Sequence, residues 1–151
     1  MRILLCAALA ACGGGASDAP SASVKSATPE QLVTSDDALD DVTITVDFED
    51  GDGDLGTGLA EVHDCRADGI ITELILPAIA PESRIGDHIS GTLELHVNDV
   101  GAIAVGTQPA LCAEQGVASL ATDKTVFCVV LIDVKGHRGD GDCTSEITLY
   151  E

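Results

Sequence analysis

The sequence predicts an all-β protein: an antiparallel β-sandwich of immunoglobulin-like type with about seven strands, or alternatively a small β-barrel. Two observations lead to this prediction. Several short segments alternate apolar and polar residues with the period of two that a half-buried strand has, and Gly, Pro, Asn or Asp separate them. No stretch carries the apolar spacing of a long amphipathic helix.

The first residues have the pattern of an export signal. Arg2 precedes a brief apolar run, which is far shorter than the roughly 20 residues that a membrane-spanning helix needs, so residues 1–11 are predicted to be a signal peptide. Leu9-Ala10-Ala11-Cys12 resembles the bacterial lipobox, in which the cysteine is lipidated, for example with palmitate, and becomes the mature N-terminus. The alternative is an ordinary signal peptide that contains a cysteine.

The lipobox predicts the protein's location. Acyl chains on Cys12 would anchor the protein to a membrane of the bacterial cell envelope. Gly13 follows this cysteine instead of Asp, which implies the outer membrane under the sorting pattern of enteric bacteria. Residues 12–40 are rich in Ala, Ser, Pro and Asp and are predicted to form a flexible tether. Residues 41–151 are long enough for one β-sandwich domain with an aliphatic core.

The strands of this domain are predicted from alternation and from apolar runs. In chain order they are expected at residues 42–48, 60–65, 70–76, 89–97, 102–105, 125–134 and 143–150. Residues 125–134 are apolar on both faces, as in a central strand. A helical turn that carries Cys112 is expected at residues 108–116, with Pro109 in its first position.

Four cysteines remain in the domain: Cys65, Cys112, Cys128 and Cys143. An even number in an exported protein predicts two disulfides. A zinc site is less favoured because no CxxC pair or close Cys/His spacing is present. A final turn centred between Arg138 and Gly139 would place Cys128 opposite Leu149, so Cys128 and Cys143 are not expected to bond. The pairing Cys65–Cys143 with Cys112–Cys128 is preferred, and Cys65–Cys128 with Cys112–Cys143 stays open.

An acidic loop, Asp47-Phe48-Glu49-Asp50-Gly51-Asp52-Gly53-Asp54-Leu55-Gly56, is the main candidate site. Clustered carboxylates on a glycine-rich loop suit calcium, which takes six to eight oxygen ligands in irregular geometry. The spacing fails the EF-hand pattern, because its sixth position is Leu55 rather than Gly. We therefore expect an irregular calcium site of Asp50, Asp52 and Asp54, with Asp140 and Asp142 donated by a second loop. The competing interpretation is a solvated acidic loop without an ion.

Several segments together resemble uncharacterised bacterial lipoproteins with a single immunoglobulin-like β-domain. The resemblance rests on the strand 42–48 with its DGDGDLG loop, on Ile89-Ser90-Gly91-Thr92-Leu93, and on the final hairpin from Val130 to Ser145. Such domains carry an Asp-Arg-x-Gly-Asn type turn, whereas this chain has Asp133-Val134-Lys135-Gly136-His137, an additional Gly-Asp-Gly-Asp and four untypical cysteines. The resemblance implies the fold and the envelope location, and it points to no established activity.

These observations predict a non-catalytic binding or structural module without cofactors other than calcium. The net charge of −19 excludes nucleic acid as a partner, because nucleic-acid binding needs Lys and Arg. Beyond the membrane reached through Cys12, the partner is expected to be an unidentified protein or glycan. An accessory subunit of an envelope complex is the alternative. A carboxylate-based hydrolase is a remote one, because the chain has only three aromatic residues to line a glycan cleft.

Overall fold

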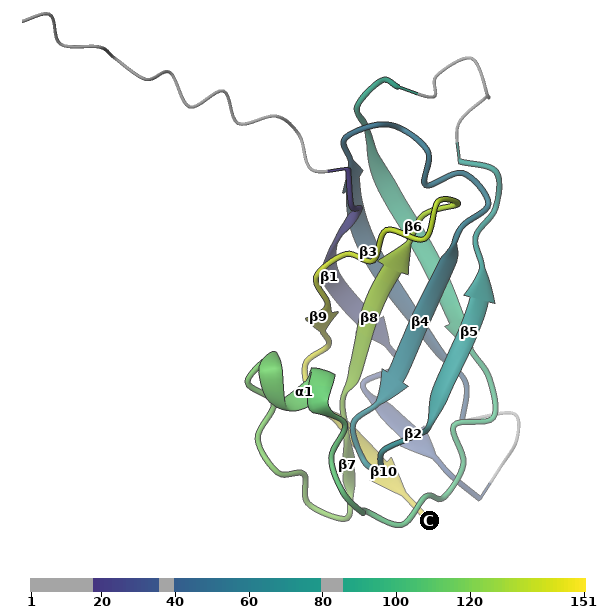
Figure 1. Ribbon diagram of the computed structural model, residues 1–151. Coiled ribbons are helices and arrows are strands. Elements are labelled where there is room, and N and C mark those ends of the chain that lie inside the picture. Colours follow the sequence, from purple (N-terminus) through teal and green to yellow (C-terminus); the bar gives the residue numbers. More distant parts are fainter. Residues whose placement is uncertain (1–17, 36–39, 80–85) are drawn as a thin grey trace, which may run out of the picture.

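A computed structural model describes residues 18–35, 40–79 and 86–151, and in this part of the chain two β-sheets pack face to face (Figure 1). One sheet has the order β1 (Ser21–Thr28), β3 (Val42–Asp50), β6 (Ile89–Val97). The facing sheet has the order β5 (Ile71–Ile75), β4 (Leu59–Asp64), β8 (Phe127–Ile132), β9 (Asp142–Cys143). The described sheets do not close on themselves, so the predicted all-β sandwich is confirmed and the barrel alternative is wrong.

A third, smaller sheet completes one end of the sandwich. In it β10 (Ile147–Tyr150) lies between β2 (Gln31–Val33), to which it is parallel, and β7 (Lys124–Thr125), to which it is antiparallel. The parallel pair ties the beginning of the described chain to its last strand. This arrangement, with antiparallel pairing elsewhere, is the immunoglobulin-like form of the sandwich.

The core lies between the two main sheets and is almost entirely aliphatic. The inward side chains of β3 are Val42, Ile44, Val46 and Phe48, and all are buried. Phe48 is accommodated because the residue paired with it on β6 is Gly91. A Cβ atom at Gly91 would lie 2.9 Å from the Phe48 ring, closer than carbon atoms pack.

The predicted flexible tether of residues 12–40 is wrong in its extent. Residues 18–35 contain β1, which pairs with β3 along its whole length, and β2, whose Leu32 is fully buried. The sequence did not predict β1 because Ala and Ser differ little in hydropathy, so the contrast between the two faces of this strand is weak. The sandwich domain therefore begins before residue 41. The predicted signal peptide and Cys12 lie outside the described residues.

The other expected elements agree with the structure in most places. The strands expected at 42–48, 60–65, 70–76, 89–97, 125–134 and 143–150 all correspond to strands, although the last two are each divided into two short ones. The expected helical turn is α1 (Ala110–Glu114), and Pro109 lies just before its first residue. Residues 102–105 form no strand. None of the described segments forms a helix with the length and hydropathy that crossing a bilayer requires.

The final hairpin turns earlier than predicted. Asp133 accepts hydrogen bonds through Oδ1 from the amides of Lys135 and His137, both at 2.8 Å, and Gly136 adopts a φ of +87°. The turn therefore centres on Lys135 instead of between Arg138 and Gly139. As a result Cys128 lies opposite Cys143 and not opposite Leu149.

This register overturns the expected disulfide pairing. Two disulfides are present, as predicted, but they join Cys65 to Cys112 and Cys128 to Cys143. The first attaches α1 to the end of β4, and the second bridges the neighbouring strands β8 and β9. The two bonds lie next to each other, with Sγ of Cys65 and Sγ of Cys128 3.4 Å apart. Together with Val126 they form a small second core under α1.

Candidate metal centre

The acidic loop connects β3 to β4 at one end of the sandwich and is held from inside. Asp50 is the last residue of β3, and its Oδ2 accepts the amide of Leu55 at 2.6 Å. Leu55 is fully buried and anchors the loop in the core. Gly53 has a φ of +70°, a conformation that residues with a Cβ seldom adopt. The hydrogen bond to Asp50 and the buried Leu55 thus hold the loop in a defined conformation.

Three carboxylates of this loop converge. Asp50, Asp52 and Asp54 each place one oxygen within 4.8 Å of the others. Asp50 is 0% exposed and Asp54 2% exposed. The Oδ1 atom of each of the three residues is buried and accepts no hydrogen bond within the described part of the chain. Buried carboxylate oxygens without partners are costly, so this arrangement favours a cation.

A lysine from the final hairpin lies against the same carboxylates. The Nζ of Lys135 is 2.7 Å from Oδ2 of Asp52 and 2.7 Å from Oδ2 of Asp54. The two loops are also joined by the amide of Val134, which donates to the carbonyl oxygen of Asp54 at 3.4 Å. Three carboxylates and one ammonium, all ionised, leave two negative charges, which one divalent cation would neutralise.

The pKa values of these groups move in opposite directions. Burial raises the pKa of Asp50 and the pKa of Asp54, and the neighbouring carboxylates add to both increases. The hydrogen bond from Lys135 lowers the pKa of Asp52. The same contacts raise the pKa of Lys135, first through Asp52 and then through Asp54. The lysine therefore stays charged, while the two buried carboxylates retain their protons to a higher pH than usual.

The structure brings the acidic loop and the final hairpin together, but only three of the five predicted ligands converge. Asp140 is exposed, and neither it nor Asp142 belongs to the group of converging carboxylates. Asp142 instead accepts the amide of Val24 at 2.7 Å through Oδ2 and that of Cys143 at 2.9 Å through Oδ1. The five-aspartate site is thus reduced to three. Asp142 joins β9 to β1, because the hairpin turn falls at Lys135 and carries residues 140–142 away from the acidic loop.

Calcium fits the remaining three ligands better than other common metals. All of them are carboxylate oxygens, which suit hard cations, whereas zinc and copper sites use His and Cys. Calcium also accepts irregular loops and completes its coordination with water and backbone carbonyl groups. A calcium ion at this position would satisfy the unpartnered Oδ1 atoms and take over part of the role of Lys135.

Two histidines also lie against carboxylates. His63 Nε2 is 3.0 Å from Glu61, which also accepts from Arg138 at 2.6 Å, and His137 Nδ1 is 2.8 Å from Asp133. The hydrogen bonds from Arg138 and His63 outweigh burial and lower the pKa of Glu61. Several hydrogen-bond donors hold these carboxylates at the base of the final hairpin, where they stabilise its conformation. Neither histidine lines one of the cavities found in the described surface.

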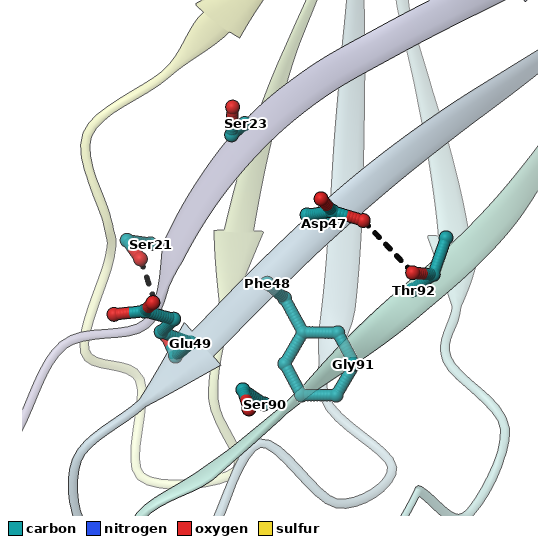
Figure 2. Close-up of a pocket in the computed structure, with 8 residues that line it drawn as sticks. All are labelled: Ser21, Ser23, Asp47, Phe48, Glu49, Ser90, Gly91 and Thr92. Carbon is teal, nitrogen blue, oxygen red and sulfur yellow. Dashed lines mark hydrogen bonds between the residues drawn. The ribbon is translucent and has the colours of Figure 1, made fainter.

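The outer face of β1, β3 and β6 carries a shallow cavity of about 650 Å³ (Figure 2). Its lining includes two carboxylates, Asp47 and Glu49, and four hydroxyl side chains: Ser21, Ser23, Ser90 and Thr92. Hydrogen bonds from Thr92, at 2.8 Å, and from Lys25 lower the pKa of Asp47, so it holds no proton to donate at neutral pH. Ligand sites are usually lined by apolar and aromatic groups. This cavity is lined mainly by polar side chains, and its aromatic residue, Phe48, is buried, so the cavity is a weaker candidate site than the acidic loop.

The sequence did not identify Lys135 as part of the candidate metal centre. The segment Asp133-Val134-Lys135-Gly136 is a turn motif with a basic residue at its tip, and this pattern could have pointed to Lys135. Comparison with protein-family models, curated proteins and solved structures finds no match to this chain.

Proposed function

We propose that the protein is a non-catalytic binding or structural module of the bacterial cell envelope, anchored by lipid on Cys12 and stabilised by calcium. The observation that carries the calcium assignment is the convergence of Asp50, Asp52 and Asp54, whose buried Oδ1 atoms have no hydrogen-bond partner among the described residues. The lipobox pattern at Leu9-Ala10-Ala11-Cys12 supports the anchor. The resemblance to single-domain lipoproteins supports the location.

The anchor would lie near the acidic loop. Ser21, the first residue of β1, pairs with Glu49, next to the end of β3 that leads into the loop. Cys12 precedes Ser21 by nine positions, which an extended chain spans in at most about 32 Å. The anchored chain would therefore enter the domain at the end that carries the acidic loop, and the other end would lie farther along the chain from the anchor.

Thermal unfolding tests the calcium assignment. The full chain carrying Cys12→Ser, which cannot be lipidated, should melt several degrees higher in millimolar calcium than in chelator, because a bound ion stabilises only the folded state. Asp50→Asn should reduce this gain, and Asp68→Asn, a change of the same charge at an exposed turn, should keep it in full. Equal melting temperatures with calcium and with chelator would refute the assignment.

Metabolic labelling tests the anchor separately. Cells that produce the wild-type chain and are grown with labelled palmitate should yield a labelled protein in the membrane fraction. Cys12→Ser should lose both the label and the membrane association. Label that persists in Cys12→Ser would contradict lipidation at this cysteine without affecting the calcium assignment.

One observation favours the accessory-subunit alternative. Ile71 and Ile75 are 45% and 78% exposed on β5, an edge strand whose outer side has no partner among the described strands. Exposed isoleucines on a free edge are a common basis for protein contacts. Ile71→Lys with Ile75→Lys should abolish co-purification of a membrane protein if this alternative holds, and should leave the calcium response unchanged.

A further inference from the structure

A second group of carboxylates lies at the opposite end of β3. Asp40 and Asp41 directly precede this strand, and Asp99 follows β6. Because Val42 pairs with Val97, these segments meet, and one oxygen of each aspartate lies within 4.8 Å of the others. β3 has nine residues, so the two acidic groups are separated by roughly 27 Å.

Asp40 is the residue that needs a partner. It is 3% exposed, and its Oδ2 accepts the amide of Gly101 at 3.0 Å. Its backbone oxygen accepts the amide of Val100 at 3.3 Å, which fixes the residue in place. Oδ1 is buried and has no hydrogen-bond partner among the described residues. A carboxylate oxygen in this situation requires a cation, a proton or a bound water.

The described basic side chains do not meet this need, because each of them has its partners elsewhere: Lys25 with Asp47, Arg66 with Asp64, Lys124 with Thr148, Lys135 with Asp52 and Asp54, and Arg138 with Glu61.

Arg66 contacts the loop that follows β6, yet it does not neutralise the group. Its side chain is 0% exposed and donates to the carbonyl oxygens of Val100 and Gly101, both at 2.9 Å. Its charge is compensated by Asp64, which its Nη2 contacts at 2.6 Å. Arg66 thus holds the loop that follows β6 in position, and no basic side chain among the described residues compensates the charges of Asp40, Asp41 and Asp99.

We infer that Asp40, Asp41 and Asp99 form a second site for a divalent cation, with calcium as the ion. All three ligands are carboxylates, one from a buried and two from exposed residues, so the exposed side leaves room for water to complete the coordination. The ion would bind Oδ1 of Asp40. It would also join the start of β3 to the end of β6, at the end of the domain that lies away from the proposed anchor.

Calcium titration by calorimetry tests this inference on the full chain carrying Cys12→Ser. The variants are Asp99→Asn, Asp50→Asn, the double variant, and Asp68→Asn as the control of equal charge. Asn at position 99 keeps the backbone, because Asp99 has a φ of +54°, which Asn also tolerates.

The expected result is two bound calcium ions in the parent and in the control, one in each single variant and none in the double variant. Loss of one of three ligands should weaken its site by at least about tenfold. If Asp99→Asn leaves the isotherm unchanged, the second site is wrong. If only Asp50→Asn leaves it unchanged, the site of the acidic loop is wrong and the second site stands. Circular dichroism of each variant confirms that it is folded.

Discussion

The two ends of β3 carry the same chemistry in different surroundings. At its C-terminal end Asp50, Asp52 and Asp54 share their charge with Lys135, at 2.7 Å from two of them. At its N-terminal end Asp40, Asp41 and Asp99 have no basic side chain within ion-pair distance among the described residues. Both groups contain a buried carboxylate with an oxygen that has no hydrogen-bond partner in the described part of the chain.

This difference shows how a protein can neutralise clustered acids in two ways. A lysine on a neighbouring hairpin supplies a permanent counter-charge that needs no ion, but it also competes with one. A group without a lysine depends entirely on what it binds from solution. We therefore expect the group with Asp40 to depend on a bound cation for its charge balance more than the acidic loop does.

The largest effect is expected from Gly58→Ala, which should break only the end with the acidic loop. A Cβ atom at Gly58 would overlap the carbonyl oxygen of Ile132 and lie 2.8 Å from that of Leu55. Overpacking of this kind costs about 3 kcal/mol, or a melting temperature lowered by about 10 °C. Thermal unfolding measures the loss. Calcium titration should then show the site of Asp40 retained, and loss of both sites would mean that the two ends are coupled.

Asp50→Asn should separate stability from ion binding. Without calcium the variant should melt at the same or a higher temperature, because the change removes a buried charge whose pKa is raised by burial. The calcium-induced gain should fall by about half if both sites contribute equally, a loss of about 2 kcal/mol at saturating calcium. A lower melting temperature in chelator would show that the carboxylate is needed for folding itself.

Lys135→Gln should sharpen the comparison by making the two ends alike. The lysine side chain is 52% exposed, so its removal should lower the stability without calcium only slightly. Calcium affinity at the acidic loop should rise about three- to tenfold, because a competing positive charge is removed. Lys25→Gln, which frees Asp47 on the outer sheet face, is the control and should not change affinity. Weaker calcium binding in Lys135→Gln would contradict competition.

The smallest effect is expected from pH. The pKa values of Asp50 and Asp54 are raised above their ordinary 3.8, so without calcium their contribution to stability is fully present below that value and is lost as the pH rises through the raised values. Calcium and protons compete for the same oxygens, and the calcium-induced gain should therefore grow between about pH 4 and about pH 7. Melting curves across this range, with and without calcium, measure the change. A gain that is independent of pH would exclude these two carboxylates as ligands.

The acidic loop illustrates how far the residue pattern reaches. Alternation in residues 42–48 placed Asp50 at the end of a strand and correctly located the loop. It could not find the second partner, because register decides which residues of another hairpin approach. The prediction named Asp140 and Asp142, whereas the turn at Asp133 and Gly136 brings Lys135 instead. Because the turn is displaced by a few residues, Lys135 lies at the acidic loop in place of Asp140 and Asp142.

The cysteines follow the same rule. Their even number correctly predicted two disulfides, since the count depends only on composition and compartment. Their pairing depends on register, and the same displaced turn made Cys128 and Cys143 appear too distant. The missed strand β1 has another cause: Ala and Ser provide little contrast in hydropathy, so its inward face became recognisable only when β3 lay beside it.

The sequence by itself determined that this protein is an all-β sandwich with two disulfides and an acidic loop at the end of a strand. These features follow from local alternation, turn residues and composition, which need no knowledge of distant contacts. Only the tertiary structure decided which carboxylates converge, that Lys135 joins the acidic loop, and that Asp99 meets Asp40 and Asp41. Those contacts connect residues that are far apart in the chain, and strand pairing and register alone bring them together.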